Sequence, residues 1–105
     1  MSSNEEINIE LVPFNRAFSS SIRLTIMLIL FFYKKVRFVE LQGILKCTPG
    51  NLDYHLKKLE SENYVIIKKI FYLTRPTTLI RITNNGENSI KSYAYKMKDI
   101  FNKVH

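Results

Sequence analysis

Residues 48–70 read TPGNLDYHLKKLESENYVIIKKI and contain two different periodicities in direct succession. Thr48 precedes Pro49, which is the typical order of an N-cap hydroxyl and a first helical residue. Three leucines follow at helical spacing and form one apolar stripe, Leu52, Leu56 and Leu59. From Tyr64 the chain becomes β-branched and aromatic, which is typical of a strand. The stretch therefore predicts a helix over about 48–62, followed directly by a β-strand.

Two further helices are predicted before this stretch. A serine among residues 19–21 can cap a first helix that runs to about Tyr33, because apolar residues recur there at helical spacing. A basic corner over residues 34–37 leads to a second, shorter helix that ends near Lys46. Four apolar residues fall on one face of this second helix, Phe38, Leu41, Ile44 and Leu45. The second and third helices then meet at a tight turn.

A β-hairpin and a last helix are predicted after the third helix. Two β-branched runs, over residues 64–71 and 78–83, supply the strands. The segment between them, YLTRPT, contains a proline and predicts a loop too long for a two-residue turn. Asn84 to Gly86 are expected to close the hairpin, and a helix is predicted from about Glu87 to Val104. Its heptad stripe comprises Ile90, Tyr93, Met97, Ile100, Phe101 and Val104.

The order helix, helix, helix, hairpin, helix predicts a mainly α fold with a β-hairpin wing, an α+β winged helix-turn-helix with a C-terminal dimerisation helix. We expect an N-terminal arm over residues 1–18, a winged helix-turn-helix domain over 19–86 and the dimerisation helix over 87–105. The first three helices and the hairpin already supply a full core, so the terminal stripe needs another surface. A homodimer follows, although the stripe alone also allows the helix to fold back on its own domain.

Charge is distributed unevenly along the chain. The first 15 residues hold three glutamates and no lysine or arginine, so residues 16–105 carry 16 basic side chains against six acidic ones, a net charge of +10. A small domain of this kind usually binds a polyanion such as nucleic acid, although a basic balance can also serve solubility alone.

The face of the third helix opposite its leucines carries amide, phenol and ammonium groups that could meet base edges and phosphates of double-stranded DNA. The start of the helix, with the Thr48 hydroxyl and the free N–H groups of Gly50 and Asn51, is a natural phosphate site. A basic wing could reach a neighbouring minor groove. The predicted DNA-binding residues are Thr48, Gly50, Asn51, Tyr54, Lys57, Lys58, Lys69 and Arg75. A solvated helix face and an ordinary loop arginine are the alternative interpretation.

Several short motifs at matching spacing resemble the small winged-helix regulators of the MarR and PadR type, especially short archaeal and bacterial ones. They are Ile22-Arg23-Leu24, Phe38 with Leu41, Thr48-Pro49-Gly50-Asn51-Leu52, His55-Leu56 with Leu59-Glu60, Tyr64-Val65, Arg75-Pro76-Thr77, and Ile82-Thr83 with Gly86. The resemblance covers Arg23 to Ala94. It implies a transcription regulator whose third helix enters the major groove, whose wing over 71–78 touches the flanking backbone, and whose terminal helices pair two subunits.

Other functions fit the sequence less well. An enzyme would need a nucleophile and a base, or paired carboxylates, in a shaped pocket, and none is expected. A metal sensor of the ArsR type would need converging ligands, but Cys47, His55 and His105 offer no ligand pair at useful spacing, so no metal or cofactor is predicted. The alternative that stays open is a winged helix that binds a protein partner.

The expected compartment is the cytoplasm. The single cysteine, Cys47, cannot form an intramolecular disulfide and is most simply a small buried residue at a turn, while a redox role stays open. No signal-peptide pattern is present at the N-terminus. The most apolar stretch, residues 22–33, is too short for a bilayer and carries Arg23, so no membrane partner is expected.

Overall fold

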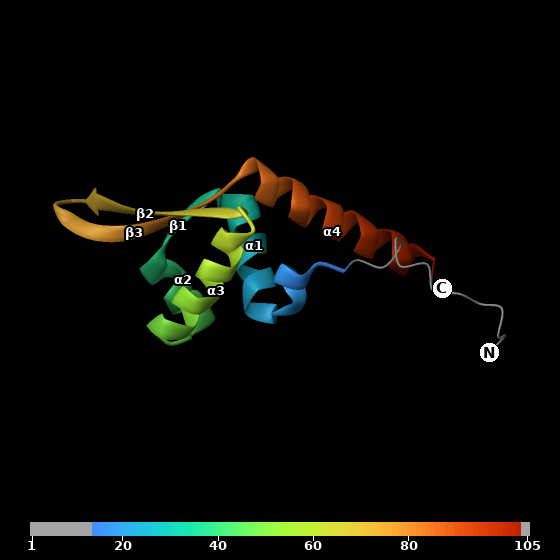
Figure 1. Cartoon of the computed structure of the whole chain (residues 1–105), viewed down its shortest axis with the longest axis horizontal. Helices are drawn as coiled ribbons and strands as arrows, with labels where there is room; N and C mark the ends of the chain where they lie inside the picture. The colour runs from blue at the N-terminus through green and yellow to red at the C-terminus, as the bar shows by residue number, and fades with distance from the viewer. Residues whose placement is uncertain (1–13, 104–105) are drawn as a thin grey trace.

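The computed structural model describes residues 14–103. Its elements are η2 (Arg16–Ser19), α1 (Ser21–Tyr33), β1 (Lys35–Arg37), α2 (Phe38–Leu45), α3 (Pro49–Ser61), β2 (Val65–Tyr72), β3 (Arg75–Ile82) and α4 (Asn84–Asn102). Figure 1 shows α1, α2 and α3 packed together, with the β2–β3 wing projecting at one end and α4 leading away at the other. The winged helix-turn-helix with a C-terminal helix is confirmed. Residues 1–13 of the predicted arm, and Val104 of the predicted stripe, lie outside the described residues.

Side-chain hydroxyls define where three of the helices begin. Ser20 Oγ accepts a hydrogen bond from the Arg23 N–H at 3.3 Å, and Thr48 Oγ1 accepts one from the Asn51 N–H at 3.1 Å. Thr83 Oγ1 accepts one from the Gly86 N–H at 2.9 Å. Each bond satisfies a donor that the first turn leaves without an intrahelical partner, which stabilises a helix by about 1 kcal/mol.

The core lies between the helices and one face of the sheet. The predicted leucine stripe of α3 is buried, together with side chains of α1, α2 and the sheet, including Ile26, Met27, Leu30, Leu41, Val65 and Ile80. Two apolar residues predicted to face the core are exposed instead, Tyr33 at the end of α1 by 72% and Ile44 in α2 by 59%. Around the axis of α2, Phe38 and Leu45 lie to one side of the buried Leu41. Ile44 lies to the other side, about 100° from Leu45, and therefore turns away from the core.

The sheet has three antiparallel strands in the order β1-β3-β2. The short strand β1 was not predicted, because three residues give no readable alternation. Val36 of β1 lies opposite Ile80 of β3, and Ile80 lies opposite Ile67 of β2. The base of the wing is thereby fixed to the segment between α1 and α2.

The predicted long loop of the hairpin is wrong. The strands continue to Tyr72 and Arg75, which pair with each other, and a two-residue turn joins them. Pro76 lies opposite Phe71 inside β3, where its missing N–H would point away from β2 and beyond the end of β1. A proline is tolerated at such an edge position.

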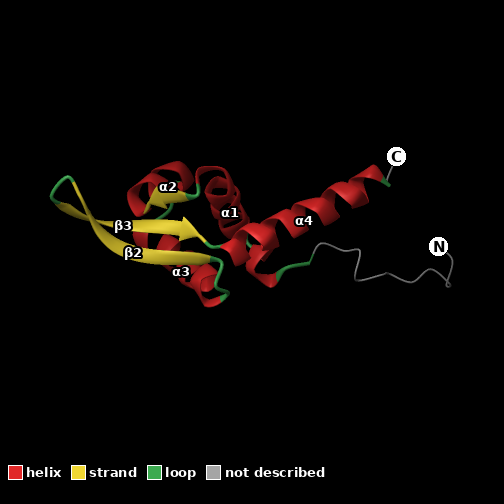
Figure 2. Ribbon diagram, turned by 90° about the horizontal axis from the view of Figure 1, so that it is seen from above, coloured by secondary structure: helices red, strands yellow, loops and turns green. Residues whose placement is uncertain are grey.

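The start of α4 also differs from the prediction. The Asn84-Asn85-Gly86 segment forms the first turn of α4 and does not close the hairpin, because the Thr83 hydroxyl caps the helix earlier than expected. Thr83 Oγ1 also donates to the Asn63 carbonyl at 2.6 Å, which ties this turn to the α3–β2 connection. Figure 2 shows α4 running away from the sheet in the direction opposite to the wing.

Within residues 14–103, we find no helix with both the length and the apolar character needed to cross a membrane.

Candidate nucleic-acid interface

The outward face of α3 carries all the helix residues predicted to bind DNA. Leu52, Leu56 and Leu59 turn inward and are at most 1% exposed, which leaves the opposite side of the helix to solvent. Five predicted residues are exposed on or beside that side, Gly50, Asn51, Tyr54, Lys57 and Lys58. A Cβ on Gly50 would meet nothing within 4 Å, so the surface there is open to a close approach by another molecule.

The N-terminus of α3 differs in one respect from the sequence analysis. The Asn51 N–H is not free, because it donates to Thr48 Oγ1 at 3.1 Å. The Thr48 hydroxyl is exposed, and its hydrogen can still be donated outward. The positive end of the helix dipole also favours an anion at this position.

Aromatic and cationic side chains are arranged together along α3. The Tyr54 ring lies edge-on to the His55 ring with centroids 5.2 Å apart, and the Lys58 Nζ lies 5.4 Å from the Tyr54 centroid. Lys57 Nζ is 4.0 Å from Glu60 Oε1, an exposed contact worth little in water. Both ammonium groups therefore remain available to a polyanion.

The Arg23 side chain of α1 contacts both η2 and α3. Its Nε donates to the Ala17 carbonyl of η2 at 2.7 Å, and its Nη1 lies 2.9 Å from His55 Nδ1. One guanidinium therefore connects the segment before α1 with the helix that carries the candidate interface. Burial, followed by the nearby charge of Arg23, lowers the pKa of His55 below its ordinary value of 6.5.

The two predicted wing residues lie on opposite faces of the hairpin. Lys69 lies opposite Thr78, and strand alternation places it on the same face as buried Val65 and Ile80. Arg75 pairs with Tyr72 directly beside the turn and faces the other way. Lys69 therefore projects beyond the helices on their side of the sheet, whereas Arg75 lies on the outer side.

An apolar groove lies between α1 and α4. Its volume is about 360 Å³, and its lining includes Leu24, Leu28, Ala94, Met97 and Phe101. Of the predicted terminal stripe, Ile90 is buried in the core, and the Tyr93 ring packs edge-on against Phe18. Phe101 is 66% exposed, and Met97 and Ile100 are half-buried.

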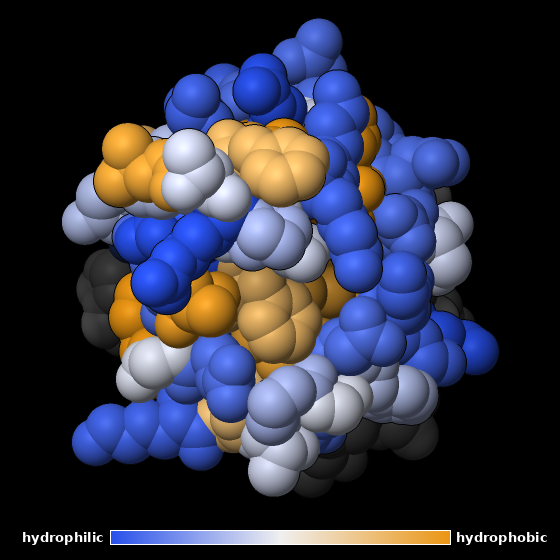
Figure 3. All heavy atoms as spheres, turned by 90° about the vertical axis from the view of Figure 1, so that its left-hand side faces the viewer, coloured by the Kyte–Doolittle hydropathy of each residue, from blue (hydrophilic) through white to orange (hydrophobic). Residues whose placement is uncertain are grey.

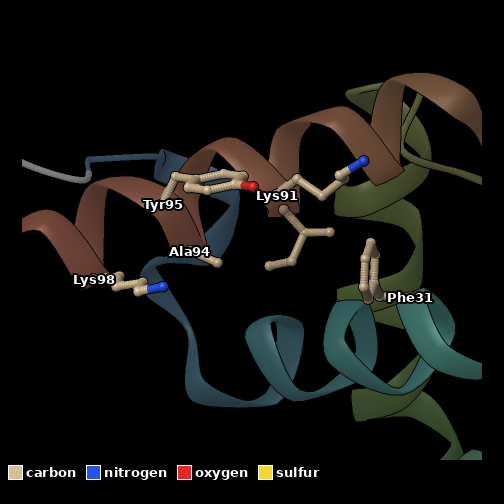
Figure 4. Close-up of a pocket in the computed structure, with 6 residues that line it drawn as sticks. Phe31, Lys91, Ala94, Tyr95 and Lys98 are labelled. Atoms are coloured by element: carbon tan, nitrogen blue, oxygen red, sulfur yellow. The ribbon is translucent and has the colours of Figure 1, made fainter.

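A neighbouring pocket of about 320 Å³ shares part of this groove. Figure 4 shows Phe31 rising from α1 towards α4, while Ala94 and Lys98 extend from α4 over the same space. Lys91 and Tyr95 border the pocket. The pocket therefore has an apolar floor and two lysines at its edge. In the described part of the chain, no three His, Cys, Asp or Glu side chains cluster as metal ligands would.

Two functional features escaped the sequence analysis. The Arg23–His55 contact joins residues 32 positions apart, and no local pattern indicates it. The exposed apolar tip of the wing was also missed, because residues 72–77 were interpreted as a long loop and the turn at Leu73 and Thr74 was not recognised. The β-branched pair Thr77-Thr78 was the available signal that β3 begins earlier.

The fold and the exposed basic helix define a DNA-binding winged helix, and comparison with known proteins agrees. Residues 22–101 match the family described as the winged helix DNA-binding domain. The chain is 38% identical over 82 residues to the uncharacterized protein MJ0432 of Methanocaldococcus jannaschii, covering 78% of this chain and 89% of that protein. Its structure is similar to that of a transcriptional regulator homologue from Pyrococcus horikoshii OT3, with a TM-score of 0.83, 29% identity, and coverage of 91% of this chain and 95% of that chain.

A further similar structure is the transcriptional regulator Tm0710 from Thermotoga maritima. The TM-score is 0.69 at 20% identity, with 81% of this chain and 59% of that chain covered, so this likeness shows the fold alone. The chain belongs to the winged helix DNA-binding domain family. It is a DNA-binding transcription regulator, as the sequence analysis predicted.

Proposed function

We propose that the chain binds a specific duplex operator as a homodimer, with α3 of each subunit in the major groove. The observation that carries this proposal is the division of α3 into two faces. Its leucines are buried almost completely, whereas the opposite face presents amide, phenol and ammonium groups to solvent. A helix held rigidly by its apolar side can present such groups to base edges and phosphates.

Asn51 and Tyr54 are assigned to base reading, because they stand near the start of the exposed face. An asparagine amide can donate to and accept from an adenine edge at the same time. Thr48, Lys57 and Lys58 are assigned to phosphates, since a hydroxyl and ammonium groups suit the backbone. The absence of a side chain at Gly50 allows the DNA backbone to approach α3 closely. Lys69 and Arg75 add phosphate contacts from the wing.

The experiment that tests these roles compares Asn51→Ala with Lys58→Ala on duplexes enriched by the wild-type chain from a random library. Asn51→Ala should cost about 1–3 kcal/mol and relax the preference at one position. Lys58→Ala should weaken binding to all sequences alike, because a phosphate contact carries no base information. Equal losses with the same sequence profile would contradict the assignment.

The homodimer is supported by the groove between α1 and α4. Leu28 is 42% exposed and Phe101 is 66% exposed, and both line an apolar surface that a second copy could cover. We assign the seam to Leu28, Met97, Ile100 and Phe101, since Ile90 and Tyr93 already pack within their own subunit. Two-fold pairing would separate the two α3 helices by about one DNA turn, roughly 34 Å, and would select an inverted repeat.

We infer that the chain acts by binding alone and catalyses no reaction, as expected for the role of its family. We further infer that it works in the cytoplasm, because the predicted partner is double-stranded DNA and a single cysteine allows no intramolecular disulfide.

A further inference from the structure

The tip of the wing exposes three successive apolar or aromatic side chains. Phe71 and Leu73 are each 80% exposed, and Tyr72 between them is 50% exposed. Figure 3 faces the end of the wing and shows apolar side chains gathered there among hydrophilic ones. A single exposed leucine is ordinary, but a run at the end of a projecting hairpin indicates an interaction site.

The turn at the tip is formed by residues that are poorly suited to it. Leu73 and Thr74 have φ angles of 51° and 67°, so both central residues of this two-residue turn are left-handed. Such turns strongly favour Asn-Gly, because β-branched and bulky residues strain there. Leu73 gains little burial within its own chain in return, since most of its surface is exposed. A strained and exposed leucine points to a role outside folding.

The geometry of the hairpin places this tip near the DNA that α3 is proposed to bind. Phe71 lies on the face of β2 that carries Val65, which is the side covered by the helices. Strands of eight residues extend about 26 Å. Half a turn of B-DNA, roughly 17 Å, separates a major groove from the adjacent minor groove. The tip can therefore reach the minor groove that flanks the α3 site.

Basic side chains surround the tip and support DNA as its occupant. Lys68, Lys69 and Arg75 are exposed on the hairpin close to the apolar run. The Arg37 guanidinium lies over the Tyr72 ring, with 4.8 Å between its carbon and the ring centroid, and so holds the wing against β1. Lys69 shares the helix side of the sheet with Phe71, whereas Lys68 and Arg75 flank the tip on the outer side. Cationic side chains thus lie on both faces of the hairpin beside the apolar tip, and a polyanion matches them.

We propose that Leu73, assisted by Phe71, is an apolar wedge that enters the minor groove beside the α3 site and partly unstacks one base step. Apolar side chains inserted from the minor groove kink the duplex towards the major groove. Flexible pyrimidine–purine steps deform most easily, so the wing selects sequence through deformability without base hydrogen bonds. This inference rests on the proposed placement of α3 on DNA.

The test uses the full chain with Leu73→Asn, a substitution that suits the left-handed turn and should preserve or raise the unfolding temperature. The probe is a duplex enriched by the wild type from a random library, with 2-aminopurine at successive flanking positions. We expect the wild type to raise the fluorescence at one step. Leu73→Asn should abolish that rise and weaken binding about tenfold at every salt concentration, because an apolar contact releases no counterions.

Two matched variants separate the wedge from general effects at the wing. Leu73→Met keeps an apolar side chain and should bind and unstack as the wild type does. Arg75→Gln removes a charge beside the same turn and should reduce the slope of the salt dependence while keeping the fluorescence rise.

Wild-type affinity and an undiminished fluorescence rise in Leu73→Asn would overturn the wedge, and so would binding lost equally in Leu73→Met. If Leu73→Asn instead released the protein from vesicles of anionic lipid and left DNA binding intact, the tip would belong to a membrane surface and the wedge would again be overturned. Failure of the wild type to enrich any duplex would refute the proposed function and the wedge together.

Discussion

Arg23 Nη1 donates a hydrogen bond to His55 Nδ1 across 2.9 Å. An arginine can only donate, so His55 Nδ1 must be an unprotonated acceptor and the ring neutral, with its proton on Nε2. Partial burial and the adjacent guanidinium both disfavour the imidazolium, which explains the lowered pKa. The hydrogen bond between Arg23 of α1 and His55 of α3 therefore depends on the protonation state of His55.

The first prediction concerns pH. The pKa of His55 is lower in the folded chain than its ordinary value of 6.5. Above pH 6.5 the neutral ring therefore contributes its full stabilisation. As the pH falls below that value, the unfolded chain takes up the proton more readily than the folded chain, and this stabilisation is lost. We expect the unfolding temperature of the wild type to fall between about pH 7 and pH 5, and His55→Gln to flatten that fall. An identical pH profile in the variant, measured by thermal unfolding, would contradict the assignment.

The second prediction concerns the Arg23 guanidinium itself. Arg23→Lys should lower the free energy of unfolding by about 1–3 kcal/mol, because a single ammonium cannot replace the planar fork that reaches both the Ala17 carbonyl and His55. Arg16→Lys is the matched control on the exposed surface of η2 and should change stability by less than about 0.5 kcal/mol. Equal effects of the two substitutions in denaturant titrations would argue against a bridging role.

The third prediction compares two glycines. A Cβ on Gly86 would collide with the Tyr64 carbonyl and the Ile82 side chain, so Gly86→Ala should cost about 1–3 kcal/mol. Gly43 lies inside α2 with open space around it, so Gly43→Ala should stabilise the protein by about 0.5–1 kcal/mol. The two opposite signs can be read from chemical denaturation, and a matching sign would show that the α4 start is packed differently.

The fourth prediction addresses the seam. Leu28→Glu combined with Phe101→Glu should convert a dimer into a monomer, because both residues line the apolar groove and neither is needed in the subunit core. Ile44→Glu introduces the same charge at an exposed apolar residue of α2 and should leave the dimer intact. Solution mass at micromolar concentration gives the answer. A monomeric wild type, or a double variant that remains dimeric, would rule out this seam.

Local chemistry allowed the helices and the fold to be predicted. The Thr48-Pro49 start and the buried leucines of α3 were readable because capping and helical periodicity act within a few residues. The tip of the wing was not readable, since Leu73 and Thr74 have no preference for the turn that they form. The partial burial of the predicted dimer stripe also depended on packing, because Phe18, at the end of the predicted N-terminal arm, covers Tyr93.

The central claim, that the exposed basic face of α3 and the wing bind duplex DNA through phosphates, is tested most directly by affinity measured as a function of salt. For roughly six phosphates neutralised per dimer, log K should fall with log salt at a slope of about −5, and Lys58→Gln should make the slope shallower by about two because each subunit loses one contact. A salt-independent affinity, or a slope that Lys58→Gln leaves unchanged, would contradict the claim.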